Sequence, residues 1–102
     1  MINTLIIDDQ EINCILIQGL LESFFTNDIK PYTTSNAEEA LELIVKIKPD
    51  LLFLDITMPE MDGFELLHKI RQIHQTEVIF VTAYEEFALN AFDNQALGYI
   101  TK

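Results

Sequence analysis

Two stretches of this chain, Leu51–Leu54 and Val78–Val81, are apolar at every position over the length of a β-strand. A strand with one exposed face alternates between apolar and polar residues, whereas a strand covered on both faces is apolar throughout. Both stretches therefore predict central strands of a sheet that helices cover on both faces. The first stretch ends at Asp55, which places a carboxylate where open α/β sheets hold their binding sites.

The remaining residues alternate between strand patterns and helix patterns. Further strands are predicted at residues 4–7, 29–34 and 99–100; helices are predicted at residues 11–25, 64–74 and 85–93, with another that Ser35 or Asn36 caps and that ends near Lys48. Pro31 cannot donate to a central ladder, so its strand is expected at an edge. Alternating strands and helices form a parallel sheet, and the most economical order is 2-1-3-4-5. The predicted fold class is α/β, with a flavodoxin-like doubly wound five-stranded sheet.

The composition is that of one compact domain without room for a second. The formal net charge of −11, from 17 acidic against 6 basic residues, disfavours direct contact of this segment with nucleic acid or with an anionic membrane surface. Cys14 is the only cysteine, which excludes a disulfide framework and a thiolate metal site within the chain. A cytoplasmic location is expected, because the chain has no basic leader and no apolar run of transmembrane length.

Polar side chains stand at the ends of four predicted strands. Asp8 and Asp9 follow the first strand, Asp55 the third, Thr82 the fourth and Lys102 the fifth. Because the carboxyl ends of parallel strands lie at the same edge of a sheet, these side chains are expected to converge. Each has a structural alternative when taken alone, such as a helix cap for the acids or a solvated chain end for the lysine. Their convergence favours a single functional site.

Three carboxylates within a few ångströms repel one another, so either some are protonated or a cation lies among them. Oxygen ligands of this kind suit Mg²⁺, with the backbone carbonyl of Thr57 as a further protein ligand. A carboxylate beside Mg²⁺ can attack a phosphoryl group and form an acyl phosphate. In this interpretation Asp55 is the nucleophile and Lys102 binds the phosphoryl oxygens, while the Thr82 hydroxyl moves in response to the phosphoryl group.

Four segments together resemble the receiver domain of bacterial two-component response regulators, a CheY-like domain: Leu5–Asp9, Leu54–Phe64, Val81–Ala83 and Tyr99–Lys102. The resemblance covers the whole chain, and the segment around Asp55 is the most specific. It implies that Asp55 is phosphorylated from the phosphohistidine of a sensor histidine kinase. It also implies that Asp9 ligates Mg²⁺ directly and that Asp8 lies nearby, often acting through water.

The same resemblance implies that Thr82 and Tyr99 form a switch pair. In that family the hydroxyl residue swings toward the phosphoryl group, and the aromatic residue on the fifth strand turns inward to fill the space. The segment Thr82–Phe92 also resembles receivers joined to LytTR-type DNA-binding domains. That would make the parent protein a transcriptional regulator, with any DNA contact made by an output domain absent from these residues.

The resemblance also has departures. The family usually has a proline after the lysine and then a fifth helix, whereas this sequence ends at Lys102. We interpret residues 1–102 as a receiver domain that is part of a longer protein. The face over strands one and three beside the first helix is then expected to be apolar and open, so that the chain associates with itself through it.

The first helix has an apolar sector wider than one buried stripe. Ile12, Leu16 and Leu20 lie on one line, and Cys14, Leu21 and Phe25 lie away from it. One interpretation is that part of this sector docks the kinase or a second copy. The other is that all of it packs onto a poorly covered sheet.

The same residues disfavour three other functions. A flavin-binding module of this topology needs a Ser/Thr/Gly-rich loop after strand one, where Asp8 and Asp9 would repel a phosphate. A haloacid-dehalogenase phosphatase typically has a second aspartate two residues after the nucleophile, and here that residue is Thr57. No P-loop motif is present. The alternative that stays open is an interaction module of the same fold that is not phosphorylated.

Overall fold

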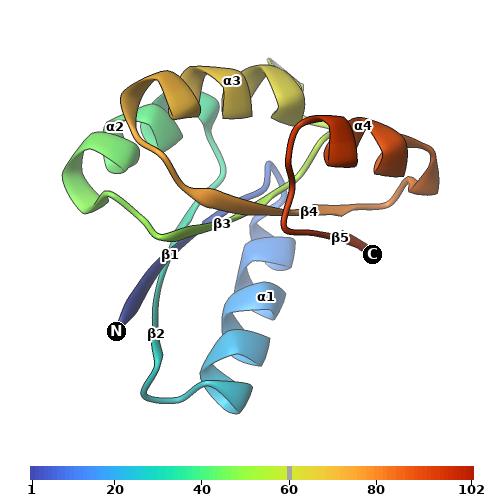
Figure 1. The fold of residues 1–102 in the computed structure, drawn as a ribbon. Coiled ribbons are helices and arrows are strands. Elements are labelled where there is room, and N and C mark those ends of the chain that lie inside the picture. The colour runs from blue at the N-terminus through green and yellow to red at the C-terminus, as the bar shows by residue number, and fades with distance from the viewer. Residues whose placement is uncertain (60) are drawn as a thin grey trace.

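The computed structural model describes residues 1–59 and 61–102; Glu60, part of the segment Leu54–Phe64 quoted above, lies outside the described residues. Figure 1 shows one sheet with helices above and below it. The elements in chain order are β1 (Ile2–Ile7), α1 (Glu11–Phe24), β2 (Ile29–Thr34), α2 (Ala37–Ile47), β3 (Leu51–Leu54), α3 (Gly63–Ile73), β4 (Glu77–Thr82), a 3₁₀ turn η1 (Glu85–Phe87), α4 (Ala88–Asp93) and β5 (Gly98–Thr101).

All strand pairs are parallel, and the sheet order is β2-β1-β3-β4-β5. The predicted fold class and strand order are therefore confirmed. The strand that contains Pro31 lies at an edge, as expected from its missing N–H. Ile7 pairs with Leu54 in the register of β1 and β3, so the residues that follow these two strands emerge side by side at the same edge of the sheet.

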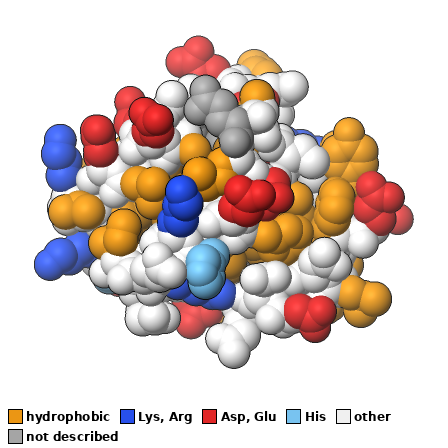
Figure 2. Space-filling model, turned by 90° about the horizontal axis from the view of Figure 1, so that it is seen from above, with side chains coloured by type: hydrophobic (Ala, Val, Ile, Leu, Met, Phe, Trp, Pro, Cys, Tyr) orange, Lys and Arg blue, Asp and Glu red, His pale blue; other side chains and the backbone are white. Residues whose placement is uncertain are grey.

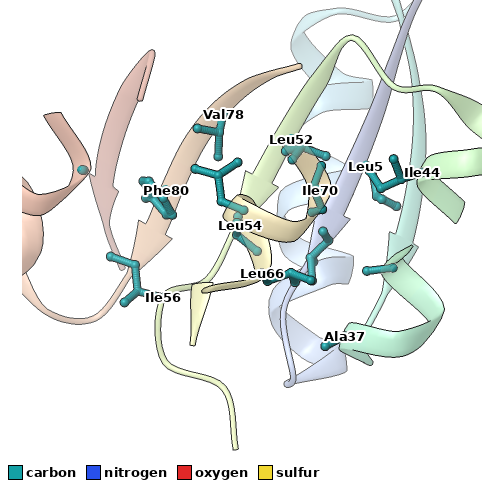
Figure 3. Close-up of a cluster of buried hydrophobic side chains, with 14 residues drawn as sticks. Leu5, Ala37, Ile44, Leu52, Leu54, Ile56, Leu66, Ile70, Val78 and Phe80 are labelled. Atoms are coloured by element: carbon teal, nitrogen blue, oxygen red, sulfur yellow. The ribbon is translucent and has the colours of Figure 1, made fainter. Parts of the chain in front are cut away.

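The main core lies between the sheet and helices α2 and α3. Side chains from β1, β3 and β4 meet those of the two helices, as the close-up in Figure 3 shows; fully buried examples are Leu5, Leu52, Leu54, Ile44, Leu66, Ile70, Val78 and Phe80. Burial of a side chain of this size contributes ~1.5–3 kcal/mol relative to leaving it exposed. This core fixes the positions of β1, β3 and β4, whose ends carry the candidate site.

Two helices begin at side-chain caps. The Asn36 side chain accepts a hydrogen bond from the Glu39 N–H at 3.0 Å, so Asn36 and not Ser35 is the cap of α2. The Asp62 side chain accepts from the Glu65 N–H at 2.9 Å and caps α3. Each cap satisfies one N–H that the first turn leaves free, which sets where the helix starts.

Helix α1 turns a different face inward than the sequence pattern suggests. Ile12, Leu16 and Leu20 are 59%, 58% and 60% exposed, whereas Cys14 and Leu21 are buried. Cys14 and Leu21 pack with Ile6, Phe53 and Val81 on the lower face of the sheet in Figure 1. The interpretation that the whole apolar sector of α1 packs onto the sheet is therefore wrong, because Ile12, Leu16 and Leu20 are more than half exposed.

The helix predicted at residues 85–93 is a 3₁₀ turn followed by six residues of α-helix. Leu89 and Phe92 point outward at 76% and 68% exposure, and Ala91 is the buried residue of α4. The predicted helix is therefore present in its second half, and its large apolar side chains are exposed. The strands β1 and β5 also extend beyond the predicted 4–7 and 99–100.

Helix α1 alone covers the lower face of the sheet in Figure 1 and leaves a groove beside it. The groove has a volume of about 780 Å³, and apolar side chains of α1, β3, β4 and β5 line it, among them Leu20, Phe53, Ile79, Val81 and Ile100. An open apolar face is thus present beside α1, but it lies mainly over β3, β4 and β5 and not, as expected, over β1 and β3. On the opposite face, seen in Figure 2, charged and hydrophobic side chains are interspersed. No helix among the described residues is both long and apolar enough to cross a bilayer.

Gly63 provides a test of the packing beneath the site. A Cβ at this position would lie 2.5 Å from the Asp55 carbonyl oxygen and 2.8 Å from the Ile56 Cα, both of which are backbone atoms. We expect Gly63→Ala to lower the free energy of unfolding by ~1–3 kcal/mol, because the backbone of the β3–α3 connection must move. Urea denaturation followed by circular dichroism measures this loss.

Gly19→Ala is the matched control. Nothing lies within 4 Å of a Cβ at Gly19, which is in the interior of α1. The higher helix propensity of alanine should raise the free energy of unfolding by up to ~1 kcal/mol. Equal effects of the two substitutions would contradict the close packing at Gly63.

Candidate functional site

The carboxyl ends of β1 and β3 bring three carboxylates together. Asp8 and Asp9 follow β1, and Asp55 follows β3. The Asp55 N–H donates to the Ile7 carbonyl at 3.0 Å, which holds the ends of the two strands in contact. Carboxylate oxygens of Asp8, Asp9 and Asp55 all lie within 4.8 Å of one another. The structure therefore joins the three acids that the sequence placed at this edge.

Asp8 is 1% exposed and its two oxygens have different surroundings. Oδ1 accepts hydrogen bonds from the Gln10 N–H at 3.0 Å and from the Asn13 Nδ2 at 3.5 Å. Oδ2 has no hydrogen-bond partner of good geometry among the described residues, but the Lys102 Nζ lies 2.8 Å away. Local backbone at the start of α1 thus fixes one oxygen and leaves the other facing the site.

Asp55 is 3% exposed and repeats this arrangement. Its Oδ1 accepts from the Thr57 N–H at 3.2 Å and lies 3.5 Å from the Thr57 hydroxyl. Its Oδ2 lies 3.3 Å from the Lys102 Nζ. Burial, together with the negative charge of Asp8, raises the pKa of the Asp55 carboxyl above its ordinary value, although Lys102 acts in the opposite direction.

Lys102 reaches the site from the end of β5. Its backbone N–H donates to the Thr82 carbonyl at 2.7 Å, which continues the pairing of β4 with β5. Burial alone would lower the pKa of the ammonium group, but the close ion pair with Asp8 and the charge of Asp55 outweigh it and raise the pKa. The lysine is therefore held protonated between two buried carboxylates.

The donor set fits a hard divalent cation. All the candidate side-chain ligands are carboxylate oxygens, and the Asp8 Oδ2 is a buried oxygen without a hydrogen bond among the residues described. Small hard ions such as Mg²⁺ prefer oxygen ligands of this type. Asp8, Asp9 and Asp55 are the residues that could hold the ion, and the Thr57 backbone carbonyl stays a predicted fourth protein ligand.

Thr82 and Tyr99 meet through the backbone of Tyr84. The fully buried Thr82 hydroxyl accepts a hydrogen bond from the Tyr84 N–H at 3.4 Å, and the Tyr99 hydroxyl donates to the Tyr84 carbonyl. The sequence analysis did not single out Tyr84. Its position two residues after a threonine, where a hydroxyl can accept from the i+2 N–H, was the available signal.

Aromatic rings connect this loop to α3. The Tyr84 and Phe87 rings pack edge to face with centroids 6.0 Å apart, and Phe87 in turn contacts Phe64 at 6.4 Å. Phe64 packs on Phe80 of β4 at 4.9 Å. Movement of the Thr82–Tyr84 loop would therefore change contacts on η1 and at the start of α3.

A family model for the response regulator receiver domain matches residues 4–102. Several curated proteins are also similar over the full chain. A transcriptional regulatory protein BtsR of Salmonella typhi is 36% identical over 103 residues, covering 100% of this chain and 42% of that protein. A positive alginate biosynthesis regulatory protein of Pseudomonas aeruginosa is 39% identical, covering 98% and 41%. The chain thus spans less than half the length of these relatives.

Solved structures agree in fold. The response regulator protein TrrA of Thermotoga maritima, crystallised in complex with Mg²⁺-BeF, superposes with a TM-score of 0.86 at 29% identity, covering 100% of this chain and 87% of that one. A CheY-like receiver domain protein of Methanospirillum hungatei gives a TM-score of 0.85 at 28% identity, covering 100% and 82%.

The raised pKa of Asp55 predicts a gain in stability for Asp55→Asn in metal-free buffer at neutral pH. The ionised carboxylate is disfavoured by burial and by Asp8, and asparagine removes the charge while keeping an acceptor for the Thr57 N–H. We expect a higher Tm by thermal denaturation, where a gain of ~1 kcal/mol corresponds to about 4–8 °C for a small domain.

The gain should depend on pH in a defined direction. The native pKa of Asp55 lies above the ordinary value of 3.8, so the cost of the charge to wild type grows as the pH rises from 3.8 and is complete above the native pKa. As the pH falls through the native pKa toward 3.8, the carboxyl becomes neutral and the advantage of asparagine disappears. An advantage that grows in acid would contradict the assigned cause.

Proposed function

The chain belongs to the response regulator receiver domain family, and on that premise we propose that Asp55 accepts a phosphoryl group from the phosphohistidine of a sensor histidine kinase. The observation that carries the proposal is the arrangement around Asp55. Its carboxylate lies among the acids of β1 and 3.3 Å from the Lys102 ammonium, at the open edge of the sheet. The chain is a phosphoacceptor and not a classical enzyme, and it assists its own phosphorylation and dephosphorylation.

The transfer is a substitution at phosphorus. An oxygen of the Asp55 carboxylate forms the new bond to phosphorus as the P–N bond to the imidazole breaks. The electron pair of that bond leaves with the ring nitrogen, and the ring departs neutral because its other nitrogen carries a proton. The product is an acyl phosphate on Asp55. The Lys102 ammonium is placed to neutralise the oxygens of the transferred group.

Asp8, Asp9 and Asp55, with the Thr57 carbonyl, would hold Mg²⁺ in this reaction. The bound ion would reduce repulsion between the carboxylates and the incoming phosphoryl oxygens. The carboxylate cluster and the buried Asp8 Oδ2 support this assignment. The similarity to TrrA, which was crystallised with Mg²⁺-BeF, supports it further.

Thr82 and Tyr99 would report the phosphoryl group to the surface. The Thr82 hydroxyl accepts a long hydrogen bond from the Tyr84 N–H at 3.4 Å and has its own proton to donate to a phosphoryl oxygen. A swing of the hydroxyl toward that oxygen would lengthen the bond to Tyr84 further. Tyr99 holds the carbonyl of the same residue, so the two side chains constrain one peptide segment. Release of that segment would change the exposed surface of η1 and α4.

The output is proposed to be control of transcription. One relative is named a transcriptional regulatory protein and another a positive alginate biosynthesis regulatory protein, and both are more than twice the length of this chain. Residues 1–102 would be the receiver domain of a protein of that kind. The net charge of −11 argues that DNA contact is made elsewhere in such a protein. The LytTR-type subfamily remains a prediction from the segment Thr82–Phe92.

Phosphorylation can be tested by intact mass spectrometry. We expect the wild-type chain, incubated with Mg²⁺ and acetyl phosphate, to gain the mass of one phosphoryl group, and Asp55→Asn to gain none. Mg²⁺ replaced by EDTA should abolish the adduct on wild type.

Asp62→Asn is the matched control. Asp62 is an exposed acid seven residues after Asp55 in the same connection, and its side chain caps α3. It should keep the adduct. An adduct of equal amount on Asp55→Asn, or none on folded wild type, would overturn the phosphoacceptor role and favour the interaction module.

We also propose that a second copy occupies the apolar groove. Leu16 and Leu20 line the α1 side of the groove and are more than half exposed, so two copies related by a twofold axis can each cover the groove of the other with these side chains. Sedimentation velocity should show an association that increases with concentration and with salt, because the net charge of −11 on each copy opposes it.

Leu20→Glu should weaken this association at least tenfold, since it places a charge in the groove. Leu89→Glu is the control, because Leu89 is 76% exposed on α4, away from the groove. A chain that stays monomeric at millimolar concentration and high salt, or an equal effect of both variants, would contradict the proposed interface.

A further inference from the structure

Two contacts join α3 to the segment that follows β4, and they differ in kind. Near the site, the Phe64 ring packs against the Phe87 ring of η1 with centroids 6.4 Å apart. Further along α3, the Arg71 guanidinium donates to the backbone carbonyls of Asn94 and Gln95, just after α4, with an Nη2–oxygen distance of 3.2 Å to Gln95. Contacts between rings tolerate sliding, whereas two hydrogen bonds from one planar group fix distance and direction. Arg71 therefore makes the more rigid of the two contacts.

The backbone that Arg71 binds has the geometry of a closed helix end. The Ala96 N–H donates to the Ala91 carbonyl at 3.0 Å. The Gln95 N–H donates to the Phe92 carbonyl, also at 3.0 Å. This pair of bonds is the Schellman motif, in which the residue after the cap takes the left-handed conformation. Gln95 does so with a φ of 57°, although glycine is the usual residue there, so contacts from outside the helix are needed to offset the cost.

The same segment is also tied to the sheet, at the edge opposite the carboxylates. The Leu97 N–H donates to the Val78 carbonyl at 2.8 Å, at the amino end of β4. Among residues 1–59 and 61–102, Arg71 forms no ion pair, so its charge is directed at carbonyls at the negative end of α4. The carboxyl end of α4 is thus held by α3 and by β4 together.

The amino end of the segment is held by fewer contacts. Within the described part of the chain, no side chain caps η1 or α4. The Tyr84 peptide is bound by the Thr82 and Tyr99 hydroxyls, to which the proposed function assigns the response to the phosphoryl group. Ala91 is the buried residue of α4, so little side-chain surface holds the helix on the upper face of the sheet, where Figure 1 shows it with α3.

We propose that Arg71 is the anchor of α4: it keeps the carboxyl end of the helix fixed on α3, so that phosphorylation of Asp55 turns the helix about this end. The inference rests on the proposed function, because the turn begins at the Thr82–Tyr84 loop. It adds the reason that a change at the site moves the helix in one direction. Arg71 is a positioning residue, since it acts through α4 and not on the reacting atoms.

The anchor determines which surface changes. Leu89 and Phe92 are 76% and 68% exposed on α4. A turn about a fixed carboxyl end carries both side chains to one new position, and Leu89 moves further because it is further from the anchor. With both ends free, these side chains would spread over many positions, and no single surface would mark the phosphorylated state.

Amide hydrogen exchange of the wild-type chain, followed by NMR, tests the anchor directly. One sample contains Mg²⁺ alone and the other Mg²⁺ with acetyl phosphate, and the intact mass of a portion reports the adduct. We expect phosphorylation to raise the exchange rates of the Tyr84 and Ala88 amides at least threefold, because their loop loosens. The rates of the Ala96 and Leu97 amides should stay within twofold.

Arg71→Met tests the contact itself, because methionine keeps an extended side chain and has no donor. The Ala96 and Leu97 amides should exchange roughly tenfold faster than in wild type, and phosphorylation should raise their rates further. Arg71→Lys keeps the charge but lacks the paired donors of guanidinium, so its rates should lie between those of the other two chains. Lys69→Met, which removes an exposed charge from α3, should behave as wild type.

Gln95→Gly, added to Arg71→Met, separates anchoring from simple stabilisation of the helix end. Glycine removes the cost of the left-handed backbone and should bring the exchange of Ala96 closer to the wild-type rate. It does not restore the contact with α3, so phosphorylation should still raise the exchange of Ala96 and Leu97. If glycine also restores insensitivity to phosphorylation, Arg71 only stabilises the helix end and the anchor is overturned.

The outcomes distinguish this inference from the function it rests on. With the adduct present, an equal rise in exchange at Tyr84 and at Ala96 in wild type overturns the anchor and leaves the phosphoacceptor role intact. Wild-type exchange rates of Ala96 and Leu97 in Arg71→Met do the same. Absence of the adduct on folded wild type overturns the proposed function, and the anchor with it.

Discussion

The repulsion among the carboxylates at the ends of β1 and β3 is the constraint on which the functional part of this structure depends. Asp8 and Asp55 are almost fully buried, and their free oxygens face each other across a space that the Lys102 ammonium bridges. The hydrophobic core beneath α2 and α3 holds the strand ends in place and therefore keeps the charges close. Folding energy is in this way used to maintain a cluster of like charges whose repulsion a bound cation can relieve.

The elements around the site divide its tasks between backbone and side chains. N–H groups at the starts of the β1–α1 and β3–α3 connections hold one oxygen of each buried acid, and so orient the other toward the site. Gly63 permits the β3–α3 connection to pass directly over the backbone of Asp55 and Ile56. On the other side, the backbone of Tyr84 joins Thr82 to Tyr99 and, through Phe87, to α3. A change in charge at Asp55 thus has a short physical route to an exposed surface.

Much of this could be predicted from the sequence because it depends on local patterns. The two apolar runs and the position of Pro31 were enough for the sheet and its order, and the strand-end residues were enough to bring Asp8, Asp9, Asp55 and Lys102 together. The inward face of α1 was not predictable, since it has apolar residues on two sides and the choice depends on what covers the sheet. Nor did the sequence indicate that Lys102 pairs more closely with Asp8 than with Asp55, because this depends on side-chain directions at two different strand ends.

The most direct test of the account is a crystal structure of the chain grown with Mg²⁺ and beryllium fluoride, a combination present in the related TrrA structure. We predict a fluoroberyllate group bonded to a carboxylate oxygen of Asp55, a Mg²⁺ ion in contact with Asp8 or Asp9, and the Lys102 ammonium on the fluoride and no longer on Asp8. A structure in which Asp55 carries no such group, while Lys102 still bridges Asp8 and Asp55, would contradict it.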